Sequence, residues 1–153
     1  MSVWELTVAG VLLLCTSMYL GTGWSLALFT LPNRPRMTVA NYHDQIVGPI
    51  RRATRFFTWM TVVMIGAAIA LIVAEWGSPY VIAPAVVLAC VVGATLVTML
   101  LLFPYNRRLT AGIEDEAELQ EVLGSWIARN WVRLALWTGQ WAAMATYFAL
   151  QAR

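Results

Sequence analysis

Four long stretches without a charged residue dominate this chain and decide what it can fold into. They cover residues 6–31, 56–74, 79–105 and 134–152. A helix of about 20 apolar residues crosses the hydrocarbon core of a bilayer, so each stretch qualifies as a membrane span. The sequence therefore predicts an all-α fold, an integral membrane four-helix bundle.

The composition excludes a soluble domain. Of the 153 residues, 60% are hydrophobic and 12% are charged, which is roughly half the charge of an average soluble domain. The length allows one transmembrane domain over residues 1–153. Its helices are predicted at about 4–31, 52–75, 79–104 and 126–151.

The basic residues predict the orientation. All ten are arginines, and nine of them follow the first or the third apolar stretch. Basic residues collect in cytoplasmic loops, so we expect a multi-pass protein of the bacterial inner membrane with both termini outside. The net charge of +2 gives no reason to expect a nucleic-acid partner.

Both arginine-rich connections contain a predicted amphipathic helix. In residues 37–50 the spacing aligns His43 with apolar side chains on one face, and in residues 114–125 a run of acidic side chains suits the start of a helix. Each segment is expected to lie at the cytoplasmic surface of the bundle. The apolar neighbours of His43 on this face are Val39, Ile46, Val47 and Ile50.

The two halves of the chain share a pattern. The segment 29–34 at the end of the first predicted helix is similar to 103–107 at the end of the third. Each contains phenylalanine, proline, asparagine and arginine in that order. An Arg-x-x-x-Trp spacing recurs at Arg55 and at Arg133. The pattern predicts a parallel two-fold internal repeat with a site at its seam, and chance similarity is the alternative.

One face of the fourth predicted helix is rich in polar and aromatic side chains. Polar groups at membrane depth normally point into a bundle or a wet cavity. We interpret Arg133 as a cation at the cytoplasmic end of an internal pocket with indole walls; the alternative is that it snorkels to the interface beside a tryptophan belt. The face comprises Trp126, Asn130, Arg133, Trp137, Gln140, Trp141, Met144 and Tyr147.

His43 is the only histidine of the chain. It cannot supply a bis-histidine haem site, and the paired Glu-x-x-His motifs of di-iron bundles are absent. We therefore expect no metal and no cofactor. His43 is the candidate general base, and a hydrogen-bonded interfacial histidine is the alternative.

Two motifs resemble those of the anthrone-oxygenase-like family of small four-helix membrane proteins. The segment 103–109 at the end of the third helix is similar to the family's Pro-x-Asn motif. Trp126 followed by Asn130 and Arg133 is similar to its Trp-spacer-(His or Asn)-x-x-Arg motif, with asparagine where many members have histidine. The resemblance covers nearly the whole chain.

The resemblance implies a cofactor-independent oxygenase that oxidises an anthrone-like polycyclic phenol with O₂. In this hypothesis His43 removes a carbon-bound proton, while Asn106, Asn130 and Arg133 stabilise the oxyanion. Tryptophans stack on the flat substrate and exclude water. The implied substrate-binding residues are Trp126, Trp131, Trp137, Gln140, Trp141 and Arg107.

Two other classes of function stay open. The chain could be an accessory subunit of a membrane complex whose arginines dock a partner or anionic lipid. It could also be a small transporter of lipophilic molecules that works as a homo-oligomer. In every case the expected partners are a lipophilic small molecule, membrane lipid or another membrane protein.

Overall fold

The computed structural model describes residues 2–152, with the side chains at positions 51 and 52 left out. Its elements are helices joined by turns, so the protein is all-α. The first rod consists of α1 (Val3–Ser25) and a π turn, η1 (Leu26–Thr30). A 3-10 elbow, η2 (Leu31–Arg36), leads to a second π turn, η3 (His43–Val47), which runs directly into α2 (Gly48–Ala74).

The second half of the chain is also helical apart from its turns. A short 3-10 turn, η4 (Pro79–Val81), opens α3 (Ile82–Leu96), which ends in a π turn, η5 (Val97–Leu102). A separate short helix, α4 (Phe103–Ala111), precedes α5 (Glu116–Gln151). The amphipathic segments expected at 37–50 and 114–125 are therefore not separate helices, since one merges into α2 and the other is the first third of α5.

Three helical stretches are long and apolar enough to cross a membrane. They are Val3–Arg36, His43–Ala74 and Pro79–Ala111. The fourth expected span, α5, is not among them, because glutamine, threonine, tryptophan and tyrosine side chains lower the hydropathy of its uncharged stretch. It is nevertheless part of the bundle, since it packs along both α1 and α3.

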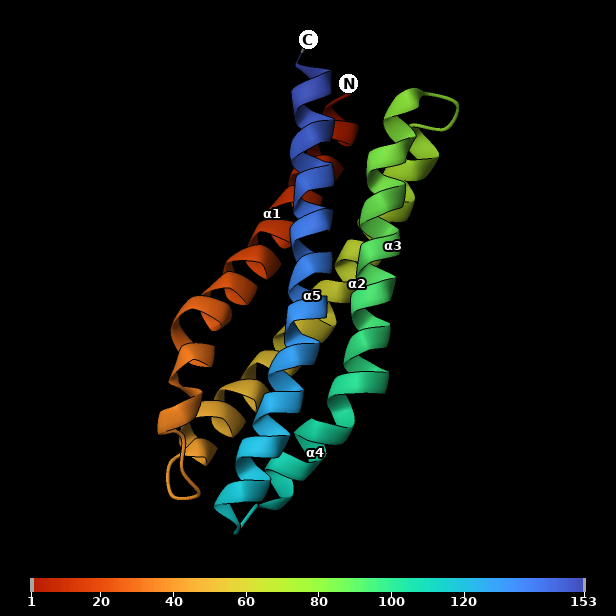
Figure 1. Ribbon diagram of the computed structural model, residues 1–153. Coiled ribbons are helices and arrows are strands. Elements are labelled where there is room, and N and C mark those ends of the chain that lie inside the picture. The colour runs from red at the N-terminus through yellow and green to blue at the C-terminus, as the bar shows by residue number, and fades with distance from the viewer. Residues whose placement is uncertain (1, 153) are drawn as a thin grey trace.

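The two ends of the bundle differ. Both termini lie at the same end as the turn between α2 and α3, and the two other connections lie together at the opposite end (Figure 1). These two connections are bonded to each other: the Tyr42 hydroxyl donates to the Leu109 carbonyl at 3.2 Å and accepts from the Ile113 amide at 2.9 Å. The arginine-rich connections therefore form one structural unit.

The interior is divided into two hydrophobic clusters. The upper cluster, near the termini, includes Leu12, Ala68, Leu71 and Met144. The lower cluster, near the connections, packs the first connection and α4 onto the first turns of α5. Its members are Ala27, Leu31, Met37, Tyr42, Ile46, Val47, Leu102, Leu109, Ile113, Leu119, Leu123, Trp126 and Leu134.

The bundle has four rods: α1 with η1, η3 with α2, α3 with η5, and α5. The first three contain a π turn, in which hydrogen bonds run from i to i+5. Each π turn holds an extra residue and shifts the helical phase of the residues after it, and such turns occur often at functional sites. The helix expected over 37–50 is not formed as a whole, because residues 37–41 are coil and turn and the helix begins at Tyr42. Ile46 and Val47 are buried, whereas His43 is exposed.

Candidate functional site

A cavity of about 470 Å³ lies in the middle of the bundle between the two clusters. This volume falls within the range of small-molecule sites, about 300–1,000 Å³. All four rods contribute to its wall, α2 and α3–η5 most of all. The wall includes Tyr19, Thr54, Phe57, Thr58, Thr61, Val62, Thr95, Thr98, Met99, Trp126, Arg133, Trp137 and Gln140.

Gln140 is the most unusual residue of this wall. Its side chain is 1% exposed, and neither Oε1 nor Nε2 has a hydrogen-bond partner within residues 2–152. Leaving a buried donor or acceptor unpaired costs about 1–3 kcal/mol. A fully buried amide beside a cavity, with both polar atoms unpaired, is therefore a candidate ligand-binding group.

Arg133 lies two helical turns before Gln140 and faces the same cavity. Its Nη2 donates to Asn130 Oδ1 at 2.5 Å, and its guanidinium lies 4.5 Å from the centre of the Trp137 ring. Its Nε is buried and unpaired among the described residues. Asn130 and Trp137 thus hold a cation in place beside the cavity, with its buried Nε unpaired among the described residues.

The two asparagines of the family-like motifs have supporting positions. Asn130 Nδ2 donates to the Trp126 carbonyl at 2.9 Å, and its Oδ1 accepts from Arg133. Asn106 Oδ1 accepts from Trp126 Nε1 at 2.9 Å. These bonds connect α4, Trp126 and Arg133, so both asparagines orient the residues that line the cavity.

Three aromatic rings form the wall beside Arg133. The Tyr19 ring lies 4.8 Å from Phe57 and 4.9 Å from Trp137, measured between centroids. The Tyr19 hydroxyl donates to the Phe57 carbonyl at 2.8 Å and lies 2.6 Å from Thr61 Oγ1. Sequence reasoning missed this contribution of α1 and α2; the threonines at 54, 58 and 61, which recur at helical spacing, were the available signal.

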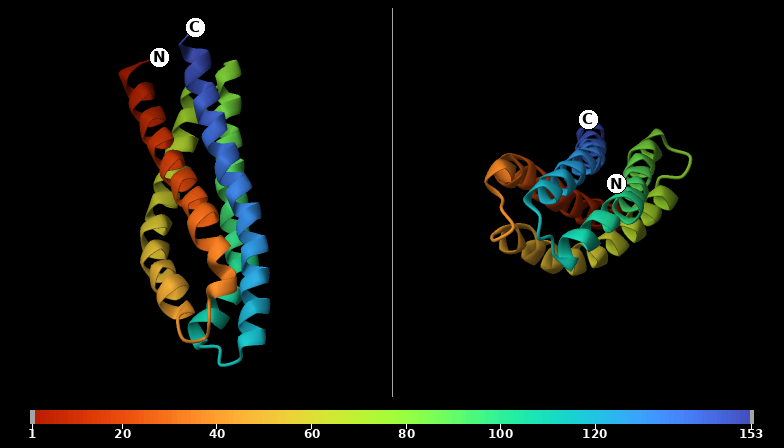
Figure 2. Two further views of the ribbon diagram at one scale, coloured as in Figure 1. Left: turned by 60° about the vertical axis from the view of Figure 1, so that its left-hand side comes forward. Right: turned by 60° about the horizontal axis from the view of Figure 1, so that its bottom comes forward.

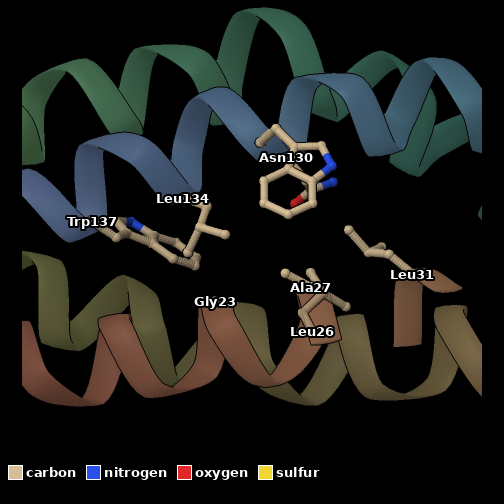
Figure 3. A pocket seen from close by; sticks show the side chains of 8 residues that line it. Gly23, Leu26, Ala27, Leu31, Asn130, Leu134 and Trp137 are labelled. Atoms are coloured by element: carbon tan, nitrogen blue, oxygen red, sulfur yellow. The ribbon is translucent and has the colours of Figure 1, made fainter. Parts of the chain in front are cut away.

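A second, much smaller hollow of about 10 Å³ lies on the other side of α5, against α1 (Figure 3). Asn130, Leu134 and Trp137 face Gly23 across it. It has room for about one water molecule. This hollow marks close packing of α1 on α5 and is too small for an organic ligand.

Not all predicted site residues come together. Arg133, Gln140, Trp126 and Trp137 line the cavity, with Asn106 and Asn130 bonded to them. The other four predicted site residues have exposed side chains and lie outside the cavity: His43, Arg107, Trp131 and Trp141. Trp131 is 47% exposed and borders the small hollow. The described lining residues include no carboxylate and no imidazole.

Metal-ligand types do not gather in the described part of the chain: no group of three His, Cys, Asp or Glu side chains there could hold an ion. No family model, curated protein or solved structure matches the chain. The resemblance to the anthrone-oxygenase-like family therefore rests on the short motifs of α4 and α5 alone.

Proposed function

We propose that the chain crosses the inner membrane four times, with both termini outside and the arginine-rich connections in the cytoplasm. Three apolar rods support this, as does the packing of α5 against two of them. We also propose that the two halves of the chain form a parallel internal repeat. The two π turns η1 and η5 support it, because each precedes a proline, Pro32 and Pro104. The distribution of arginines supplies the orientation.

The function that the geometry supports best is binding of a lipophilic small molecule that carries a polar oxygen group. One observation carries this proposal: Gln140, fully buried at the cavity wall, has no partner for its amide among the described residues. A ligand oxygen that accepts from Nε2 would satisfy a group that otherwise destabilises the fold. The apolar and aromatic wall would hold the remainder of the ligand.

Arg133 favours an oxygen with negative charge. Its unpaired Nε and its guanidinium are held near the aromatic wall, where a charge-assisted hydrogen bond is about twice as strong as a neutral one. The ligand class is thus a flat or chain-like hydrophobe with a carboxylate, phenolate or enolate.

Binding of a fluorescent hydrophobic carboxylate tests this function. Pyrenebutyrate accepts excitation energy from tryptophans, and the matched neutral probe is pyrenebutanol. We expect Arg133→Gln to bind pyrenebutyrate at least about tenfold more weakly, a loss of about 1.4 kcal/mol, and the carboxylate to bind more tightly than the alcohol. The control is Arg129→Gln, because Arg129 is one turn away and contacts Tyr105 and the Ser125 carbonyl instead.

Equal binding by both variants and the unmodified protein would contradict this function. A smaller effect at Arg129 than at Arg133 is required, because both substitutions remove one positive charge from α5. Circular dichroism of each variant confirms that the helices are retained.

A narrower second candidate is the oxygenase activity that the resemblance implies. It is favoured by the unpaired donors of Arg133 and Gln140, which could stabilise an enolate oxygen. The anion of an anthrone would react with O₂ so that one oxygen atom becomes the new quinone carbonyl and the other leaves as hydroxide, which takes a proton from the solvent to become water. Because His43 does not line the cavity, the substrate would lose its proton to water before it binds.

Oxygen uptake with an anthrone tests the second candidate. Purified protein should accelerate the oxidation over buffer, and Arg133→Gln should remove the acceleration. An unchanged rate in the presence of folded protein that binds pyrenebutyrate would leave binding as the function and exclude the oxygenase.

A further inference from the structure

The cavity is closed along the axis of the bundle toward the termini. Toward the termini it ends at Met64 and Val91, both buried members of the upper cluster. Toward the connections its wall consists of Trp126, which belongs to the lower cluster and is held by Asn106, and of the exposed Pro49 at the start of α2. A ligand that came from the aqueous side at the termini would have to cross the packed upper cluster.

The side of the cavity is open between α2 and η5. Two lining residues on opposite edges are largely exposed: Val62 of α2 at 58% and Met99 of η5 at 55%. Thr54 and Thr58 of α2 and Thr22 of α1, also lining residues, are exposed as well. Side chains that line a cavity and are also exposed mark its mouth.

The packing of the rods explains this opening. Near the hairpin turn α2 packs on α3, whereas η5 packs on α4 and α5. Figure 2 shows the lower part of α2 bowed away from the other helices. The π turn of η5 is wider than an α-helical turn, and it lies where the two rods separate.

The opening lies between two of the apolar stretches that are able to cross a membrane. We propose that the ligand enters and leaves the cavity sideways from the bilayer, through the opening between α2 and η5. The inference rests on the proposed binding function and adds the class of ligand: a molecule dissolved in the membrane, whose apolar part can extend into the lipid.

The polar groups along this path agree with entry from lipid. The threonine hydroxyls of α2 and α3–η5 each donate to a carbonyl of their own helix, at 2.8–2.9 Å. The hydroxyls of these threonines are therefore paired, whereas buried polar atoms of Arg133 and Gln140 farther inside have no partner among the described residues. A polar head group gains its hydrogen bonds only after full entry, with its apolar part toward the mouth.

Two neighbouring valines of α2 provide a matched test. Val62 lies at the mouth, while Val63 is 48% exposed and is not a lining residue. We expect Val62→Trp to slow loading of pyrenebutyrate about tenfold, because the new indole narrows the mouth, and Val63→Trp to load at the rate of the unmodified protein. Met99→Trp narrows the mouth from the other edge and gives a second variant if Val62→Trp fails to fold.

The experiment uses the full chain in phospholipid vesicles, and energy transfer from tryptophan to pyrene is followed after mixing. The signal of Arg133→Gln gives the background from probe dissolved in lipid. The loading rate should follow the mole fraction of probe in the bilayer when the amount of lipid is varied. A loading rate that follows the aqueous probe concentration would overturn lateral entry. So would Val62→Trp and Met99→Trp variants that load at the rate of the unmodified protein.

Failure of this inference can be distinguished from failure of the proposed function. If Arg133→Gln and the unmodified protein give the same transfer, the cavity does not bind the probe and the function itself is wrong. If Arg133→Gln loses binding while Val62→Trp, Met99→Trp and Val63→Trp all load normally, the site is correct and the route is wrong.

Discussion

Replacing Gln140 by methionine should make the empty protein more stable and at the same time impair ligand binding. Methionine has nearly the same length and volume as glutamine, so packing is disturbed little. The substitution removes the two amide atoms that have no partner among the described residues. Stability and function therefore change in opposite directions at this position.

The size of the effect follows from the burial of the side chain. An unpaired buried polar group costs about 1–3 kcal/mol in soluble proteins. Hydrogen bonds between membrane helices average only about 0.6 kcal/mol, because the unfolded chain in the membrane also finds partners. Taking the lower end of the first range, we expect Gln140→Met to raise the free energy of unfolding by about 1 kcal/mol.

Gln120→Met is the matched control on the same helix. Gln120 Nε2 donates to the carbonyls of Met37 at 2.9 Å and Arg34 at 3.3 Å, so this amide ties the first connection to α5. Its replacement should lower the free energy of unfolding by about 1 kcal/mol. The two substitutions are chemically identical and are expected to have opposite signs.

The assay is reversible unfolding in mixed micelles, with SDS as denaturant and circular dichroism as the signal. Native mass spectrometry first verifies that no small molecule has been carried through purification, because a bound ligand would stabilise the unmodified protein. If Gln140→Met lowers stability as much as Gln120→Met does, Gln140 has a structural partner. The reasoning that makes it a ligand-binding group would then be refuted.

Three further substitutions test separate contacts. Trp126→Phe removes the donor to Asn106 and should cost about 1 kcal/mol in the same unfolding assay, and a double-mutant cycle with Asn106→Ala should give less than additive losses. Gly23→Ala places a methyl 2.7 Å from Leu134 and Trp137, whereas at Gly66 the space is open; relative to Gly66→Ala it should be less stable by about 1–3 kcal/mol, and equal stability would contradict the close contact. His43→Ala should leave pyrenebutyrate binding unchanged, because His43 is exposed and outside the cavity; a loss as large as that of Arg133→Gln would restore it to the site.

Hydrophobic pattern predicted the rods and the polar face of α5. The length of the stretches without charged residues located the three apolar rods. The three- or four-residue spacing located four residues that are buried in α5: Trp126, Asn130, Trp137 and Gln140. Both signals depend on local sequence only. They predict which side chains face the interior of the bundle, and they do not predict which residues of other helices those side chains contact.

The cavity itself was beyond such reasoning. It exists because α2 separates from η5, and a π turn leaves no characteristic spacing in the sequence. His43 was also misplaced: an ideal helix over 37–50 aligns it with Ile46 and Val47, whereas the helix begins only at Tyr42 and His43 is exposed. The contribution of Tyr19 and Phe57 depends on the packing of α1 against α2, which sequence spacing within one helix does not specify.

The central claim is that Arg133 and Gln140 bind the oxygen group of a lipophilic molecule. Its most direct test is native mass spectrometry of the protein extracted from the membranes of its own host in mild detergent, compared with Arg133→Gln and Arg129→Gln. We expect the unmodified chain and Arg129→Gln to carry a bound molecule of lipophilic character that Arg133→Gln lacks. An empty unmodified protein, or a bound molecule that survives Arg133→Gln, would contradict the claim.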